Sequence, residues 1–338
     1  MRVFSALEGN FSDNDIAAAA DILKAGGVVA FPTETVYGLG ARYDCEAAIK
    51  KIFAAKGRPA DNPLIVHIAH PEELAMVAQG ISPQEEKLMM YFWPGPLTLV
   101  LTKNPALSGL VTAGLNTVGV RMPSHPLALR LITAAGVPIV APSANLSGRP
   151  SPTAARHVAE DLAGSIDALC DGGETTVGLE STVARVYFDR IVVLRPGSVT
   201  RAMLQEATQL PVVLATHADG VPEAPGMKYV HYAPRAEIFL YLGDQISAMT
   251  AALDNEAKVA VIAHSDTLEL LPSTAHKFTL GERGCADLAA RKLYAYLREA
   301  DGMGIECILV EGIVPEGLGE AVMNRLRKAA SRVIGEQK

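Results

Sequence analysis

Short apolar runs alternate with helical patterns through the first two hundred residues, and this alternation constrains the fold more than any other feature. Residues 12–31 show one unit of it. Ser12 and Asp15 have capping-box spacing, an alanine-rich helical stretch follows, and Gly26–Gly27 ends that stretch before the apolar run "VVAF". Strands that alternate with helices in this way predict an α/β fold.

The same order recurs downstream, where proline stands near the start of several helical patterns. We expect helices at residues 46–57, 71–80, 82–93, 126–136 and 151–164, and strands at residues 63–69, 96–101, 118–123 and 138–143. Residues 182–197 then predict two strands around a turn at Asp189–Arg190. A hairpin beside crossover units indicates a mixed rather than purely parallel sheet.

The regular alternation stops between Leu210 and Pro234, where four prolines and two glycines predict an extended linker. Buried strands at residues 237–242, 258–264 and 307–312 follow, with amphipathic helices at 285–302 and 317–331. We therefore expect a catalytic α/β domain at residues 1–208, a linker at 209–235, and a smaller, doubly wound α/β domain at 236–338.

Composition narrows the class of protein. The chain has 338 residues, of which 49% are hydrophobic and 20% charged, and this balance predicts well-packed domains. The formal net charge of −7 argues against binding of nucleic acid through the overall charge of the protein. The N-terminus has no apolar segment and no 18-residue apolar run occurs, so we expect a cytoplasmic protein without a membrane contact. No metal-ligand spacing joins the four cysteines, Cys45, Cys170, Cys285 and Cys307.

Several common motifs are absent from the sequence. No P-loop and no G-x-S-x-G occur, and the G-x-G that begins at Gly38 lacks the third glycine of a dinucleotide fingerprint. His67 and His70 are three residues apart on an expected strand and its end, which does not suit a metal site. We therefore predict no metal ligands among the protein side chains.

The candidate binding residues lie in polar loops at the ends of the expected strands. In "KGRPADNPL", Lys56 lies at the C-terminus of an expected helix, where a cation interacts favourably with the helix dipole. The alternative is that Lys56 and Arg58 bind an anion together. "FPTETVYGLG" puts three hydroxyls directly after a buried strand, and ligands of α/β folds bind where strands end. The alternative is a polar turn whose glycines supply unusual φ angles.

A loop of small residues, "APSANLSGRPSPT", follows the strand at 138–143 and offers Ser143, Asn145, Ser147 and Ser151. Such a loop lets backbone N–H groups approach a phosphate, and a helix that starts near Pro152 would direct its N-terminus at it. The alternative is an N-capping loop, which would account for Ser151 alone.

Arg121 lies among apolar residues of an expected strand, where an unpaired charge is costly. It should face a carboxylate, either the protein's own or a ligand's. "GLESTV" adds Ser181 and Thr182, and Arg195 ends another strand. Together these loops predict a pocket for a ligand with phosphates and a carboxylate. No arrangement for covalent catalysis stands out, so the reaction would depend on positioning and charge stabilisation.

These motifs together resemble those of the Sua5/YrdC/TsaC family, the threonylcarbamoyl-AMP synthases. "KGRPADNPL" is similar to the family's Lys-x-Arg loop and "PSANLSG" to its Ser-x-Asn motif, and "FPTETVYGLG", "WPGPLTLVL" and "GLESTV" fit as well. The resemblance covers about residues 10–205. The linker "PGMKYVHYAP" and the second domain resemble the longer, two-domain Sua5 type.

The resemblance implies a YrdC-like twisted mixed-sheet domain followed by a Rossmann-like one, and a reaction. L-threonine, bicarbonate and ATP would give L-threonylcarbamoyladenylate and pyrophosphate, the first step of tRNA t6A modification. It implies Mg²⁺ with ATP and no organic cofactor, with Lys56 and Arg58 as catalytic residues. Threonine would be held by Thr35, His67, Arg121 and Ser181. ATP would be held by Lys56, Arg58, Asn62, Thr117, Ala141, Ser143, Asn145, Ser151, Arg195 and Tyr232.

Partners and alternatives follow from the same resemblance. The adenylate would pass to a transferase of the TsaD/Kae1 type, with a weak tRNA contact. The linker would act as a lid, with Tyr232 reaching the nucleotide and water kept from a labile adenylate. One alternative is a double-stranded RNA-binding factor for translation or ribosome maturation. Another is a carbamoyl transferase related to hydrogenase maturation proteins, whose acylphosphatase and zinc-finger segments are not visible here.

Overall fold

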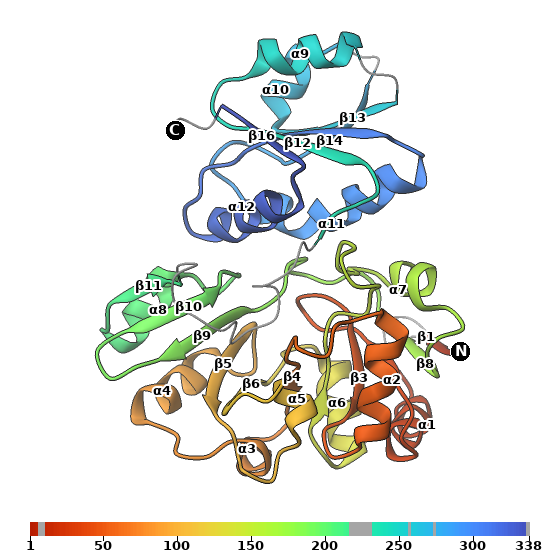
Figure 1. Cartoon of the computed structure of the whole chain (residues 1–338), viewed down its shortest axis with the longest axis vertical. Helices are drawn as coiled ribbons and strands as arrows, with labels where there is room; N and C mark the ends of the chain where they lie inside the picture. The colour runs from red at the N-terminus through yellow and green to blue at the C-terminus, as the bar shows by residue number, and fades with distance from the viewer. Residues whose placement is uncertain (6–10, 216–231, 256–257, 273–274, 336–338) are drawn as a thin grey trace. The chain divides into compact units, whose positions relative to one another are not determined.

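The computed structural model describes residues 1–5, 11–215, 232–255, 258–272 and 275–335. The chain divides into two compact units (Figure 1). The larger unit contains Met1–Ser147, Ser151–Thr176 and Glu180–Tyr229, and the smaller unit contains Gly148–Pro150, Val177–Leu179 and Val230–Lys338.

One mixed sheet forms the larger unit. Its strand order is β1-β8-β2-β3-β7-β4-β6-β5-β9-β10-β11, and it contains both parallel and antiparallel pairs. The predicted hairpin is confirmed, since β9 and β10 pair antiparallel around the turn at Asp189–Arg190. The strands are β1 (Arg2–Ser5), β2 (Val29–Phe31), β3 (Gly38–Arg42), β4 (Ile65–His67), β5 (Leu97–Thr102), β6 (Thr117–Arg121), β7 (Ile139–Val140), β8 (Ala168–Asp171), β9 (Thr182–Val186), β10 (Ile191–Arg195) and β11 (Val212–Leu214).

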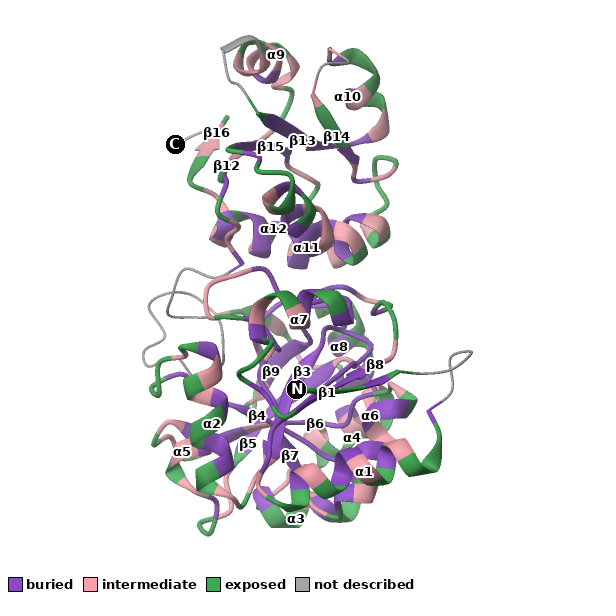
Figure 2. Cartoon of the chain, turned by 90° about the vertical axis from the view of Figure 1, so that its right-hand side faces the viewer, coloured by how far each residue is buried: buried purple, intermediate pink, exposed green. Residues whose placement is uncertain are grey.

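Helices cover the sheet and bury apolar residues from both of its faces. Successive side chains of a strand point to opposite faces, and β2 shows the result: Val29 and Phe31 join one core, and Ala30 joins the other. Much of the sheet is therefore buried on both sides (Figure 2). The helices are α1 (Asp13–Lys24), α2 (Glu46–Lys56), η1 (Pro71–Glu73), α3 (Leu74–Val77), α4 (Pro83–Phe92), α5 (Gly109–Thr112), α6 (Pro126–Ala135), α7 (Ala155–Leu162) and α8 (Arg201–Thr208).

The first predicted helix is confirmed in detail, because the Ser12 hydroxyl accepts the N–H of Asp15 at 3.1 Å and caps α1. Three expectations were wrong in part. The helix expected at residues 71–80 begins as η1, continues as α3 and ends at Val77, three residues early. The helix expected from residue 151 begins at Ala155. Part of the expected linker forms β11, which pairs with β10.

The G-x-G at Gly38 is also not a loop, because both glycines lie in β3. A Cβ built on Gly40 would lie 2.7 Å from the ring of Phe31 on β2, so glycine is required there for close strand packing. This explains Gly40 without a dinucleotide site and without an unusual φ angle.

The smaller unit is a doubly wound parallel sheet, as the sequence predicts. Its strand order is β14-β13-β15-β12-β16, and every pair is parallel. Helices α9 and α10 cover one face, and α11 and α12 cover the other (Figures 1 and 2). The elements are β12 (Glu237–Tyr241), α9 (Ile246–Asn255), β13 (Val259–Ala263), α10 (Ser265–Leu270), β14 (His276–Thr279), α11 (Asp287–Gly302), β15 (Cys307–Glu311), α12 (Leu318–Ala329) and β16 (Arg332–Ile334).

Candidate functional site

Lys56 ends helix α2, and its side chain is only 2% exposed. Gly57 follows in the left-handed region, with φ at 59°, and turns the chain out of the helix. Lys56 Nζ donates to the carbonyl oxygens of Ser143 and Asn145 at 2.5 and 2.6 Å. The Lys-x-Arg and Ser-x-Asn loops, far apart in sequence, are thereby joined by a buried ammonium. The helix expected at residues 46–57 is confirmed, since α2 extends to Lys56 and is capped by Gly57.

Arg58 does lie in the loop after α2, and its guanidinium shapes that loop. Its Nη2 donates to the carbonyl oxygens of Asn62 and Pro63 at 3.2 and 2.9 Å. Asn62, predicted to contact ATP, is 6% exposed and lies in the same turn. These contacts leave the loop compact, with two cations, Lys56 and Arg58, on either side of Gly57.

Arg121 ends strand β6, and the carboxylate expected beside it is the protein's own. Its Nη2 lies 2.7 Å from Oε1 of Glu34, and its Nη1 donates to Thr35 Oγ1 at 2.9 Å. Its Nε donates to the carbonyl oxygen of Gly95. Burial would raise the pKa of Glu34, but the guanidinium and backbone N–H donors outweigh it and lower the pKa. Glu34 is therefore ionised and paired.

His67 lies beside Arg121, because β4 and β6 pair in parallel with these two residues in register. Burial and the positive charge of Arg121 lower the pKa of His67 to about 3, so its imidazole is neutral. In the described structure its Nδ1 has no hydrogen-bond partner. A buried ring nitrogen without a partner is uncommon, and it suits a ligand that supplies the missing bond.

Ser181 precedes strand β9 and makes a second cluster of polar contacts. Its hydroxyl lies 2.8 Å from Thr98 Oγ1 on β5, and Arg195 Nη2 donates to it at 3.1 Å. Arg195 Nε donates to the Ser181 carbonyl oxygen. Arg195 and Ser181, predicted to hold different substrates, are thus in direct contact. The cluster therefore lies where the two predicted sets of residues meet.

Ser151 is not a helix cap, because α7 starts four residues later. Its hydroxyl instead donates to Oε1 of Glu180 at 2.5 Å, and both side chains are buried. The bond joins "SGRPSPT" to "GLESTV", so the two motifs belong to one site. Neither Glu180 nor Glu34 was among the predicted site residues, although each lies inside a motif that contains predicted site residues.

The register of the sheet separates the remaining predicted residues. Thr117 starts β6 and Arg121 ends it, which puts roughly 13 Å of strand between them. Ala141 donates its N–H to the Ile65 carbonyl, at the end of β4 away from His67. The strands therefore hold predicted nucleotide residues toward one end and predicted threonine residues at the other.

Tyr232 lies in the smaller unit. Its ring stacks on Tyr294 of α11, with 5.5 Å between ring centroids, and the guanidinium of Arg325 lies 5.5 Å from the centroid. The predicted contact with ATP stays a prediction. Residues 216–231 of the expected lid lie outside the described residues.

Neither a membrane-spanning helix nor a cluster of metal-ligating side chains occurs among the described residues. No helix there has both the length and the apolar character needed to cross a membrane. Within the same residues, no three His, Cys, Asp or Glu side chains gather as metal ligands would.

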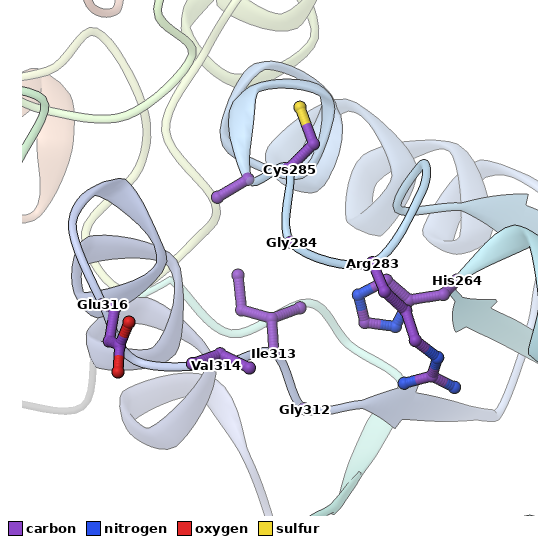
Figure 3. Close-up of a pocket in the computed structure, with 9 residues that line it drawn as sticks. His264, Arg283, Gly284, Cys285, Gly312, Ile313, Val314 and Glu316 are labelled. Carbon is purple, nitrogen blue, oxygen red and sulfur yellow. The ribbon is translucent and has the colours of Figure 1, made fainter.

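A cavity of about 360 Å³ lies in the smaller unit, at the carboxyl ends of β13 and β15. Figure 3 shows Arg283 and His264 side by side in its wall, with Ile313 and Val314 on the β15–α12 loop. Glu311 ends β15 and accepts from the His264 N–H at 2.9 Å and from Arg283 Nη2 at 2.7 Å. Burial would raise the pKa of Glu311, but these partners lower it to about 2.

Glu311 should therefore stabilise the smaller unit above its ordinary pKa and stop doing so in acid. A carboxyl group whose pKa is lowered by folding loses its contribution as pH falls from the unfolded pKa to the folded one. We expect Glu311→Gln to cost roughly 2 kcal/mol near neutral pH, with the difference from wild type vanishing as pH falls from 4.5 toward 2. Hydrogen exchange of β13 and β15, together with urea titrations across this pH range, measures the difference in unfolding free energy. A difference that stays constant across the range would contradict the prediction.

Known proteins are similar to this chain over nearly its whole length. The Sua5–YciO–YrdC family profile, described as telomere recombination, matches residues 21–197. A profile described as threonylcarbamoyl-AMP synthase, C-terminal domain, matches residues 199–331. The threonylcarbamoyl-AMP synthase of Pyrococcus abyssi is 46% identical over 93% of this chain and 94% of that protein. That of Bacillus subtilis is 46% identical over 96% of this chain and 95% of that protein. The crystal structure of P. abyssi Sua5 complexed with L-threonine matches at a TM-score of 0.90 and 44% identity, over 98% of each chain.

Proposed function

The chain belongs to the Sua5/YrdC family, and we propose that it synthesises L-threonylcarbamoyladenylate from L-threonine, bicarbonate and ATP. In class it would be a nucleotidyltransferase. The observation that supports this most directly is the arrangement of polar groups along shared strands. Buried Arg121, Thr35 and His67 lie at one end of β4 and β6, and Lys56 lies beside the Ser143–Asn145 loop.

The residues then have separate tasks. Arg121, Thr35, His67 and Ser181 would bind threonine, with the guanidinium on the carboxylate. The amine and bicarbonate would give a carbamate and water. A carbamate oxygen would attack the α-phosphorus of ATP while the bond to pyrophosphate breaks. Lys56 and Arg58 would stabilise the charge that develops on the phosphates, as preorganised cations do.

The nucleotide would lie along the loops that the other predicted residues build. Asn62, Thr117, Ala141, Ser143, Asn145, Ser151 and Arg195 would line it. Magnesium bound with ATP would neutralise phosphate charge. A cytoplasmic location, transfer of the adenylate to a TsaD/Kae1-type protein and a weak tRNA contact stay predictions.

The test is an omission series with the full chain. We expect pyrophosphate release only when ATP, magnesium, bicarbonate and L-threonine are all present, and mass spectrometry should identify threonylcarbamoyl-AMP. Replacing threonine by alanine should abolish the signal, because alanine offers no hydroxyl. Pyrophosphate release without threonine or bicarbonate would contradict the proposal, and salt-sensitive binding of double-stranded RNA with no ATP turnover would favour the RNA-binding alternative.

A further inference from the structure

Glu34 lies in the middle of "FPTETVYGLG" and is held on two sides. Its side chain is 9% exposed, and Oε2 accepts the backbone N–H of Ser124 at 3.1 Å. Oε1 lies 2.7 Å from Nη2 of Arg121. The two side chains therefore form a close ion pair in a buried site. A buried group on the neighbouring strand, Nδ1 of His67, lacks a hydrogen-bond partner in the described structure.

The nitrogens of Arg121 limit how a ligand carboxylate can bind. Nη1 donates to Thr35, Nε donates to the Gly95 carbonyl, and Nη2 lies 2.7 Å from the Glu34 carboxylate, so protein groups contact all three nitrogens. A carboxylate that binds at Nη2 must share the guanidinium with Glu34. Two carboxylates on one buried guanidinium leave an uncompensated negative charge, which is costly in a buried site.

An α-amino acid solves this problem, because its ammonium and carboxylate lie on the same carbon. The carboxylate can pair with Arg121 while the ammonium pairs with Glu34, and the buried site stays neutral. We propose that Glu34 is a specificity-determining residue that binds the ammonium group of L-threonine. This inference rests on the proposed threonine site. The neutral imidazole of His67 does not compete with the ammonium for Glu34, and its Nδ1 is available to the substrate.

Two analogues of threonine each lack one of its two charged groups. 2,3-Dihydroxybutanoate keeps the carboxylate and the side chain but has a hydroxyl in place of the ammonium. Threoninol keeps the ammonium and lacks the carboxylate. If Glu34 binds the ammonium, wild-type protein should bind threonine roughly 10- to 100-fold more tightly than dihydroxybutanoate, because a charged hydrogen bond is missing from the analogue.

The decisive measurement is calorimetric binding of these three ligands to full-length wild type and Glu34→Gln. The variant should lose roughly 10- to 100-fold in affinity for threonine and a comparable factor for threoninol. Its affinity for dihydroxybutanoate should stay unchanged or rise, because Arg121 no longer has a competing carboxylate. Glu73→Gln is the matched control. Glu73 is also buried and accepts backbone N–H groups of Ala69 and His70 at 2.7 and 3.0 Å, but it has no role in the site.

Equal weakening of threonine and dihydroxybutanoate in Glu34→Gln would overturn the proposal, because it would show that Glu34 acts only by positioning Arg121. Unchanged threonine affinity would overturn it as well. If the variant does not fold, the wild-type ratio decides, and equal affinities for threonine and dihydroxybutanoate overturn the proposal. A wild-type protein that binds no threonine would instead refute the threonine site itself, and this outcome is distinct from threonine binding without discrimination.

Discussion

Arg121→Ala should abolish threonine-dependent turnover and destabilise the larger unit at the same time. The variant loses the proposed carboxylate ligand, and preorganised charge contacts of this kind contribute roughly 100- to 1,000-fold to turnover. It also leaves the Glu34 carboxylate buried without its cation, since the pair is 4% and 9% exposed in the wild type. Breaking a buried pair in this way costs roughly 3–5 kcal/mol. Pyrophosphate release and urea unfolding measure the two effects.

The two effects can be separated by a second substitution. Adding Glu34→Gln to Arg121→Ala removes the stranded charge, so most of the lost stability should return while turnover stays low. Arg130→Ala is the matched control, because Arg130 pairs with fully exposed Asp13 at 2.7 Å, and exposed pairs contribute roughly 0–1 kcal/mol. An Arg121→Ala protein as stable as wild type would show that Glu34 does not depend on the guanidinium.

The alternation of strands and helices could be predicted because it is local. Helix α1 shows this, since its cap, alanine run and terminating glycines are all contiguous in the chain. The exceptions arise from contacts distant in sequence. Strand β3 needs glycine at position 40 because Phe31 packs against it, and β11 forms because β10 offers an edge to the chain after α8. Neither partner can be identified from the segment itself.

The prediction of the site had the same limit, because contacts between residues distant in sequence cannot be identified from one segment. Arg121 could be predicted to face a carboxylate because an arginine among apolar strand residues has few other solutions. Which carboxylate it faces depends on the position of the loop after β2, which brings Glu34 to Arg121. Glu180 depends in the same way on a distant partner, because its carboxylate accepts from Ser151. In both motifs the sequence feature that could identify the glutamate as a site residue is a charge between small polar residues. Such a charge needs a partner when the loop is buried.

Lys56 and Arg58 should respond differently to replacement by alanine, although they are two residues apart. Arg58→Ala should reduce pyrophosphate release by roughly 100- to 1,000-fold and leave unfolding nearly unchanged, because the hydrogen bonds that it donates to Asn62 and Pro63 stay within its own loop. Lys56→Ala should lose turnover and stability together. It deletes a buried ammonium and leaves the Ser143 and Asn145 carbonyls without this donor, at a cost of roughly 1–3 kcal/mol.

Lys51→Ala is the control on the same helix, because its exposed ammonium donates only to the Gly26 carbonyl in the described structure. It should match wild type in turnover and differ in stability by less than about 1 kcal/mol. Lys56→Ala with full stability would show that the Ser143–Asn145 loop holds its conformation without the ammonium. Arg58→Ala with full turnover would remove Arg58 from the phosphate site, and Lys56 would then be the one cation of the Lys-x-Arg loop left to act on the triphosphate.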